Sequence, residues 1–315
     1  MANWHRSVHR LRLDITAGKE KSMRIAVASG KGGTGKTTIA ISLALSLAEE
    51  GHPPIFLDGD VEAPNAHLFL NPAFKQHQEV AILIPQVDKS KCTYCGKCTE
   101  ACQYHAIVLV GQKTLVFPQL CHGCGSCTLV CPENAITEMP EVTGVLERGS
   151  ARSGISFARG VLNIGEPMAV PVIRQLKKWA EPEPGQIEIL DAPPGTSCPV
   201  VESMRGADFV LLVTEPTPFG LHDLRLAVEV ARELNIPAGV VINRDGPGDV
   251  QVDEFCQAEG IPILMRVPFE RSIAEGIARG RSLADVHPEY AQRFRRMMVQ
   301  IAELLADTAK TESVL

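Results

Sequence analysis

The sequence predicts an α/β fold with a doubly wound, mainly parallel β-sheet, interrupted by a small α+β insertion. Short apolar runs alternate with helical stretches along most of the 315 residues, as in a parallel sheet with helices on both faces. A glycine-rich turn joins the first strand to the first helix, and a cysteine-rich segment divides the alternating pattern into two halves. The predicted strands are 24–29, 54–58, 187–191, 208–213, 238–243 and 262–267.

The chain divides into three segments. Residues 1–22 form a polar, basic arm without clear periodicity, residues 23–86 and 141–315 supply the alternating strands and helices, and residues 87–140 form the insertion. With 45% hydrophobic and 22% charged residues, the chain can build one large domain and one small one. The net charge of −6 argues against a dedicated nucleic-acid binder, because binding nucleic acid depends on neutralising phosphates.

Eight of the ten cysteines form two copies of one pattern, Cys-x2-Cys-x2-Cys-x3-Cys, within the insertion. A chain binds a pair of iron–sulfur clusters in this way, with three thiolates from one tight loop and a fourth from the other copy. The spacing therefore predicts two 4Fe-4S clusters, close enough for an electron to pass between them. The predicted ligands are Cys92, Cys95, Cys98 and Cys131 for one cluster, and Cys121, Cys124, Cys127 and Cys102 for the other.

Other uses of these cysteines fit less well. The first twenty residues contain no apolar signal segment, which argues against a secreted disulfide framework. Zinc sites use paired Cys-x2-Cys knuckles and do not require a third and fourth cysteine at these offsets. All-thiolate cluster ligands instead favour a reducing, cytoplasmic location, and no apolar run is long enough to predict a membrane span.

The cysteine pattern resembles that of bacterial two-cluster ferredoxins. The second copy ends in Cys131-Pro132, as in that family, whereas the first copy reads Cys102-Gln103. The resemblance implies a small ferredoxin-like domain of α+β structure at residues 87–140, in which each copy supplies one cluster loop and a short adjoining strand.

Upstream, residues 30–38 read Gly-Lys-Gly-Gly-Thr-Gly-Lys-Thr-Thr between a strand and a helical stretch. This is the phosphate-binding pattern G-x-x-x-x-G-K-T in its required strand–loop–helix context. Backbone N–H groups and the helix N-terminus would face the phosphates of ATP, Lys36 would reach the β- and γ-phosphates, and Thr37 would bind Mg²⁺. The candidate nucleotide-binding residues are Gly30, Gly32, Gly33, Thr34, Gly35, Lys36, Thr37 and Thr38.

Lys31, directly after the first glycine, resembles the second lysine of the deviant Walker A loop in the MinD/ParA/Mrp superfamily of P-loop ATPases (the SIMIBI class). That superfamily includes the nitrogenase iron protein. The resemblance implies a P-loop NTPase fold and a homodimer in which Lys31 reaches the partner's nucleotide. A solvated loop lysine is the alternative interpretation.

Three aspartates fit the same family. Asp58 and Asp60 follow the strand 54–58, as in switch I; the resemblance implies that Asp60 positions the attacking water and that Asp58 lies near the Mg²⁺ shell. Asp191 ends the strand 187–191 and precedes Ala-Pro-Pro-Gly, as in switch II, where it would contact Mg²⁺ through water. Asp58 could instead cap the helix that follows. The resemblance thus gives Lys31, Lys36, Asp60 and Asp191 as the candidate catalytic residues.

Further assignments rest on the resemblance alone. Asn243, at a strand end, would read adenine, and Pro268 belongs to the segment that closes the base pocket. Cys198 follows Asp191 by seven residues, a distance similar to that of a cluster-ligating cysteine in the nitrogenase iron protein. Two copies of Cys198 could meet in a symmetric dimer and bind a cluster or metal, or Cys198 could be a structural thiol. Cys256 is predicted to be a buried apolar residue.

The leading functional hypothesis is an ATP-hydrolysing homodimer whose ATPase cycle gates electron transfer through the two clusters to a redox partner. The insertion leaves the chain after switch I and returns before switch II, and such loops change shape with the γ-phosphate. Two alternatives stay open. One is an ATP-dependent, Mrp-like carrier that delivers an iron–sulfur cluster or metal to an apo-protein acceptor, and the other is a MinD/ParA-like switch that recruits a partner.

Overall fold

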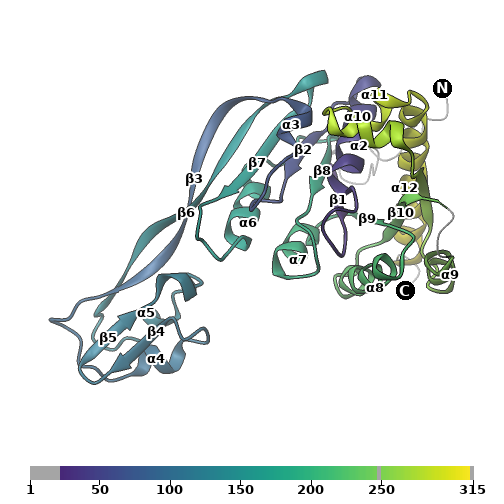
Figure 1. Cartoon of the computed structure of the whole chain (residues 1–315). Coiled ribbons are helices and arrows are strands. Elements are labelled where there is room, and N and C mark those ends of the chain that lie inside the picture. Colours follow the sequence, from purple (N-terminus) through teal and green to yellow (C-terminus); the bar gives the residue numbers. More distant parts are fainter. Residues whose placement is uncertain (1–21, 247–249, 313–315) are drawn as a thin grey trace.

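A nine-stranded β-sheet runs through the protein in the computed structural model, which describes residues 22–246 and 250–312 (Figure 1). The strand order is β11-β10-β9-β1-β8-β2-β7-β6-β3, and all neighbours from β11 to β7 are parallel, whereas β6 and β3 are antiparallel. The predicted mainly parallel sheet is therefore confirmed. The strands are β1 (Met23–Ala28), β2 (Ile55–Asp58), β3 (Ala73–Val87), β6 (Ile136–Ser150), β7 (Ser156–Leu162), β8 (Ile187–Asp191), β9 (Phe209–Thr214), β10 (Ala238–Asp245) and β11 (Ile263–Pro268).

Helices cover both faces of the sheet, because alternate residues of each buried strand point to opposite sides. Ile25 and Val27 of β1 face one apolar layer with α2 and α12, and Ala26 and Ala28 face the other with α6 and α8. The body helices are α2 (Lys36–Glu49), α3 (His67–Leu70), α6 (Val170–Trp179), α7 (Cys198–Met204), α8 (Pro218–Glu233), α9 (Gln251–Ala258), α10 (Arg271–Ala278), α11 (Leu283–Val286) and α12 (Glu289–Glu312), with a 3₁₀ turn, η2, at Arg152–Gly154. Within the described residues, no helix combines the length and apolar character needed to cross a bilayer.

The six predicted strands are all present, with ends displaced by no more than two residues. The sequence did not predict β3, β6 or β7. Most residues of β3 and β6 are exposed or half-buried, so these strands lack the continuous apolar runs that mark the buried parallel strands. The arm predicted at residues 1–22 lies, apart from Ser22, outside the described residues.

Strands β3 and β6 extend beyond the sheet as a two-stranded stalk. The two strands pair along their full lengths, but only residues 144–150 of β6 also pair with β7. The remainder, residues 81–87 and 136–142, leaves the body of the protein, and we call it the stalk (Figure 1). A register shift between Val80 and Ala81 marks the point of departure.

The stalk carries the segment 88–135, which we call the cysteine lobe. It contains α4 (Lys97–Ala101), the hairpin of β4 (Ile107–Val110) and β5 (Lys113–Val116), a 3₁₀ turn at Pro118–Leu120, and α5 (Ser126–Leu129). Its buried apolar core consists of Ile82, Ile84, Ala106 and Cys121. The domain boundary predicted near residue 87 falls at the outer end of the stalk, whereas the one near residue 140 falls within it, because β3 and β6 run through both the body and the stalk.

Candidate functional site

The glycine-rich loop lies between the end of β1 and the start of α2, so the N-terminus of this 14-residue helix faces it. Gly35 has φ 89° and immediately precedes the helix. A Cβ atom at Gly35 would lie 2.2 Å from the side-chain nitrogen of Asn243, so no larger residue fits without displacing that side chain. The Ser29 hydroxyl donates to the Lys31 carbonyl at 2.7 Å and holds the first turn of the loop.

Lys36 and Thr37 both bind the carboxylate of Asp191. The Lys36 Nζ atom lies 2.8 Å from Asp191 Oδ1, and the Thr37 hydroxyl donates to Asp191 Oδ2 at 2.6 Å. Lys36 and Asp191 are buried, since the loop and the end of β8 enclose them. The predicted lysine, threonine and switch II aspartate are thus adjacent in space, although Asp191 is more than 150 residues away in sequence.

Asp58 is fully buried at the end of β2. Its Oδ2 atom accepts a hydrogen bond from the Ala66 amide at 3.0 Å, just before α3, but it does not cap that helix. Its Oδ1 atom is buried without a hydrogen-bond partner. Burial, and then the negative charge of Asp191, raises the pKa of Asp58 to about 7. A buried carboxylate oxygen without a hydrogen-bond partner destabilises the folded protein. Binding of a proton or a cation to Asp58 would remove this penalty.

This arrangement fits Mg²⁺. The Thr37 hydroxyl and the carboxylates of Asp58 and Asp191 are hard oxygen ligands of the type that Mg²⁺ prefers beside a nucleotide. Asp60 lies two residues beyond Asp58, and burial raises its pKa. The predicted catalytic carboxylates therefore lie together at the carboxyl ends of the parallel strands, beside the glycine-rich loop.

Lys31 does not point freely into solvent. Its Nζ atom lies 3.4 Å from Glu215 Oε2, and Glu215 Oε1 also lies 2.5 Å from Arg244 Nη1. Glu215 follows β9 directly, and its role was missed because nothing in its local sequence links it to residue 31. Within the single chain, Lys31 is thus held by an ion pair, which would have to break before this lysine could reach a partner's nucleotide.

The predicted adenine-binding residues also lie at the carboxyl ends of the parallel strands. The Asn243 amide donates to the Thr34 carbonyl at 2.7 Å, so this side chain contacts the glycine-rich loop directly. Pro268 ends β11 and pairs with Asp245 of β10. The exposed Phe269 follows Pro268. A role for these residues in binding the base stays a prediction.

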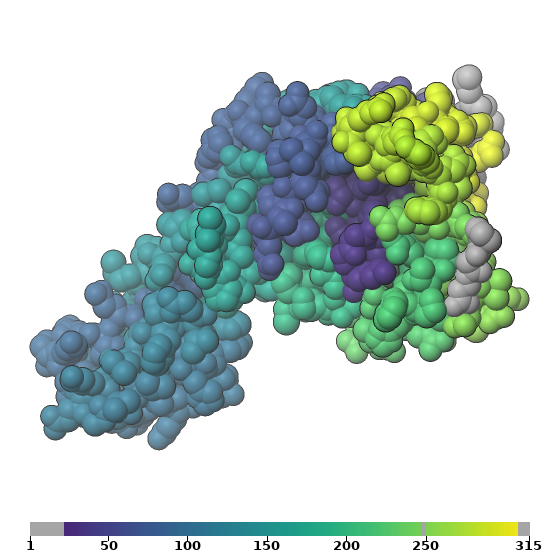
Figure 2. Space-filling model, viewed as in Figure 1, coloured from purple at the N-terminus to yellow at the C-terminus, as the bar shows by residue number. Residues whose placement is uncertain are grey.

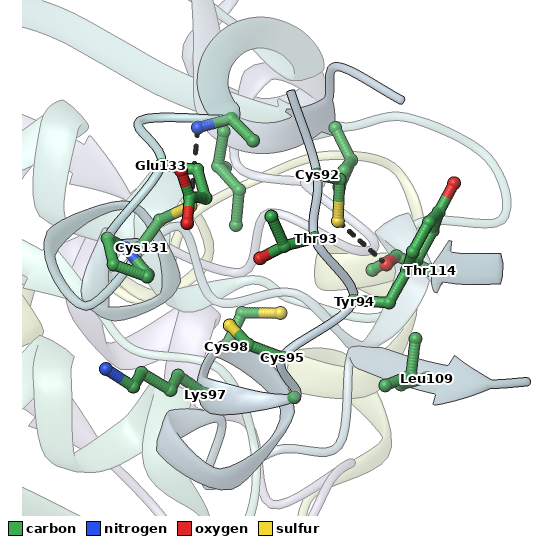
Figure 3. Close-up of a pocket in the computed structure, with 15 residues that line it drawn as sticks. Cys92, Thr93, Tyr94, Cys95, Lys97, Cys98, Leu109, Thr114, Cys131 and Glu133 are labelled. Carbon is green, nitrogen blue, oxygen red and sulfur yellow. Dashed lines mark hydrogen bonds between the residues drawn. The ribbon is translucent and has the colours of Figure 1, made fainter. Parts of the chain in front are cut away.

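The cysteine lobe contains two small cavities, each lined by four cysteines. Cys92, Cys95, Cys98 and Cys131 line the first cavity, where the cysteine from the second copy faces three from the first copy (Figure 3). The second cavity is lined by Cys102, Cys121, Cys124 and Cys127. The grouping is the crossed one that the cysteine spacing predicts, three thiols from one copy and one from the other.

The backbone repeats around the two cavities. The Ala106 amide donates to Cys102 Sγ, and the Ala135 amide donates to Cys131 Sγ, both at 3.3 Å. Gly96 and Gly125, with φ of 80° and 74°, precede α4 and α5 in the same way. N–H groups directed at sulfur stabilise a thiolate, so the backbone itself favours metal-bound cysteine.

The four thiols that line each cavity are the donor set that a 4Fe-4S cluster uses. Within the described ranges, no group of three or more His, Cys, Asp or Glu side chains converges closely enough to hold one metal ion. Four thiols spread around a cavity suit a cubic cluster, because each thiolate binds a different iron. Tetrahedral zinc would require all four sulfurs to meet around one atom.

The cysteine lobe projects away from the nucleotide site. Figures 1 and 2 show it at the far end of the stalk, whereas the glycine-rich loop lies within the body. The sequence suggested that the insertion would lie beside the two switch loops, and the stalk separates them. Cys198, the first residue of α7, is exposed on the body, and Cys256 is buried as predicted, with its pKa raised to about 11 by burial.

The glycine-rich loop, its carboxylates and the parallel sheet match a known family. Residues 25–283 match the model of the CobQ/CobB/MinD/ParA nucleotide binding domain. The chain belongs to this family. MinD from Pyrococcus horikoshii, solved with Mg-ADP, has the same fold, with a TM-score of 0.53 at 20% identity, covering 92% of this chain and 98% of MinD.

Proteins of similar sequence include an uncharacterized protein and several iron-sulfur cluster carriers. The uncharacterized protein MJ0579 of Methanocaldococcus jannaschii is 32% identical over 267 residues, which cover 82% of this chain and 91% of MJ0579. The iron-sulfur cluster carrier protein of Aquifex aeolicus is 26% identical over 308 residues, which cover 91% of this chain and 68% of the carrier. The protein is thus a P-loop nucleotide-binding protein of the MinD/ParA type with relatives named as iron–sulfur carriers.

Proposed function

We propose that this protein is an ATP-dependent iron–sulfur protein that carries a cluster or metal to an apo-protein acceptor. The observation that carries the proposal is the presence of two crossed four-cysteine cavities and a complete P-loop site in one chain. The names of relatives such as the Aquifex aeolicus carrier support this function over the gating of electron transfer, which was the leading hypothesis from sequence.

In this proposal, the nucleotide site uses its own residues as follows. Lys36 and the loop amides bind the phosphates, and Asp60 orients the attacking water. Thr37, Asp58 and Asp191 hold Mg²⁺, which neutralises charge on the phosphates when bound. Lys36 and Thr37 both contact Asp191, so these two contacts would have to open for Lys36 to reach the phosphates and for Thr37 to bind Mg²⁺.

The proposal also assigns a homodimer. Lys31 would leave Glu215 and reach the nucleotide of the partner chain, which makes hydrolysis dependent on dimer formation. The Lys31 side chain is 34% exposed, and Glu215 keeps its ion pair with Arg244 when Lys31 leaves, so the buried carboxylate retains a partner.

The eight cysteines of the lobe would hold two resident 4Fe-4S clusters, which store electrons. The transferable cluster would be a third one, bound between two copies of Cys198, which is exposed beside switch II. Two thiolates leave a cluster with open ligand positions, which suits transfer to an acceptor.

The test is an anaerobic cluster-transfer assay. Full-length protein is reconstituted with iron and sulfide, its iron and acid-labile sulfide are counted, and transfer to an apo-ferredoxin is followed with and without Mg-ATP. We expect more than eight iron atoms per chain, of which the excess moves to the acceptor. Cys198→Ala should lose the excess iron and the transfer, whereas Cys256→Ala, the matched control, should retain both. Transfer that is unaffected in Cys198→Ala would contradict the carrier site.

Gating of electron transfer is the second candidate function. Each cavity is lined by three cysteines from one copy of the cysteine pattern and one from the other copy. Two clusters held by such crossed ligands lie close together, which favours electron transfer between them. Gating predicts that Mg-ATP shifts the midpoint potential or the reduction rate of the lobe clusters without any transfer of iron. A third possibility, ATP-driven partner recruitment, predicts neither change and a nucleotide-dependent complex.

A further inference from the structure

The loop between β7 and α6, residues 163–169, touches both the nucleotide-binding body and the cysteine lobe. We infer that this loop transmits the nucleotide state of the switch loop at residues 59–66 to the iron–sulfur clusters of the lobe. The inference rests on the proposed function, because it assigns the route by which ATP acts on the lobe despite the length of the stalk.

The first contact joins the switch loop to β7. The Leu162 amide, at the end of β7, donates to the Val61 carbonyl at 2.8 Å, and Val61 directly follows Asp60. Val61 is buried, and a Cβ atom at Gly160 of β7 would lie 2.7 Å from its side chain. Only glycine permits this close approach, so a displacement of Asp60 and Val61 must displace the end of β7.

The second contact joins the loop to the base of the stalk. The Asn163 amide donates to the Thr143 carbonyl, and its side-chain nitrogen donates to the Val142 carbonyl, both at 2.9 Å. Val80 of β3 pairs with Gly144 of β6, and the next residue, Ala81, pairs with Val142. Thr143 of β6 is therefore an extra residue that has no partner on β3. Such a bulge bends a strand and raises its local twist. Asn163 therefore holds the stalk at the point where its direction is set.

The third contact joins the loop to the lobe itself. Met168, at the other end of the loop, packs against the small core formed by Ile82, Ile84, Ala106 and Cys121. Cys121 is a predicted cluster ligand, and the Ala106 amide donates to the sulfur of another, Cys102. Met168 thus contacts a core that the stalk and the lobe share, and two members of that core, Ala106 and Cys121, line the second cavity.

The three contacts lie along one stretch of chain, residues 162–168, within which the Glu166 amide donates to the Asn163 carbonyl at 3.1 Å. A two-stranded ribbon alone is only marginally stable, so contacts on its faces, such as those of Ile82 and Ile84 in the small core, help to set the direction of the stalk. Met168 and Asn163 brace the stalk at two points, and both belong to a loop whose first residue follows the switch contact. Coupling between two sites requires an element that can adopt two conformations, with the balance between them shifted by the ligand at each site. In this proposal the loop is that element, and nucleotide shifts its balance.

The experiment measures the release of iron from the lobe of the full-length, reconstituted protein. Loss of iron to bathophenanthroline disulfonate is timed anaerobically with and without Mg²⁺ and a non-hydrolysable ATP analogue. We expect the analogue to change the release rate of the wild-type protein by about fivefold or more, at the lower end of ordinary coupling. Met168→Ala and Asn163→Ala should bring the ratio of the two rates to about one, with analogue affinity unchanged.

Met139→Ala is the matched control, because Met139 lies on the stalk and is 52% exposed. Its rate ratio should equal that of the wild type. The ratio separates coupling from simple loosening of the lobe, which would raise both rates equally and leave the ratio intact. Hydrogen exchange of amides 88–135, measured with and without the analogue, gives a second readout that needs no iron release.

The outcomes separate this inference from the proposed function. A wild-type ratio of one, or ratios that stay at the wild-type value in both Met168→Ala and Asn163→Ala, would overturn the inference even if cluster transfer through Cys198 is observed. A ratio that is lost in these variants supports the inference even if no cluster reaches an acceptor, in which case the proposed carrier function fails alone.

Discussion

The body and the cysteine lobe of this protein are held together by different forces. The body buries two extended apolar layers, one on each face of its sheet, and needs no ligand to form a core. The lobe and stalk share only a small apolar core, formed by Ile82, Ile84, Ala106 and Cys121, with few further buried apolar side chains such as Ile107 and Ile136. A unit this small rarely folds on apolar burial alone and usually depends on metals or disulfides. We therefore expect the nucleotide site to form without its ligand, and the lobe to depend on bound clusters for its fold.

The largest expected effect concerns removal of the clusters. Chelation of iron should unfold the lobe and leave the body intact, because cluster binding supplies most of the folding free energy of the lobe. Amide protection in residues 88–135 should fall by at least ~100-fold, while β1, β8 and β9 keep theirs. Hydrogen exchange detected by mass spectrometry measures both regions in one sample. Full protection of the iron-free lobe would show that it folds without its clusters.

The next effect tests the nucleotide site of the body. Lys36→Ala should lower the rate of ATP hydrolysis by about 100-fold or more, because the charge that contacts the transferred phosphate is lost. Steady-state phosphate release measures it, and Lys75→Ala, an exposed lysine on β3, serves as the control. Iron content should be unchanged in Lys36→Ala. A simultaneous loss of iron would mean that the two regions are not independently folded.

The smallest effect concerns the stability of the body. Lys177 is buried, and its ammonium group donates to the carbonyls of Glu202 and Arg205, both at 2.6 Å. Burial lowers the pKa of Lys177 to about 8 from its ordinary value of 10.5. Between these values the unfolded chain holds the proton more tightly than the folded chain, so this group makes the free energy of unfolding rise as the pH rises from about 8 to 10.5.

Lys177→Met should remove that rise and lower the free energy of unfolding by about 1–3 kcal/mol at pH 7, since two buried carbonyls lose their donor. Lys178→Met, an exposed neighbour on the same helix, should change neither quantity. Denaturant titrations between pH 7 and 10 give both values. An unchanged pH dependence in Lys177→Met would show that another group titrates in this range.

Several features followed from local sequence. The glycine-rich loop, the six buried strands and the crossed grouping of the eight cysteines depend on short spacings, which fix the backbone within a few residues. The polar strands β3 and β6 escaped prediction because their stability comes from pairing with each other, not from an apolar pattern. Glu215 escaped it because its partner Lys31 is distant in sequence.

The sequence by itself predicted the types of binding site in this protein. These are a phosphate-binding loop with its carboxylates, and two sets of thiols with the spacing of cluster ligands. Spacing indicates this because the phosphate-binding residues lie in one turn and three of the four thiols of each cavity lie in one repeat, although Asp191 and the fourth thiol come from elsewhere in the chain. Only the tertiary structure decided how the two sites are related, with the lobe held away on a stalk and touched by Met168. That relation depends on an antiparallel pairing between residues 73–87 and 136–150 and on a loop contact, and neither has a local signal, because long-range packing alone creates them.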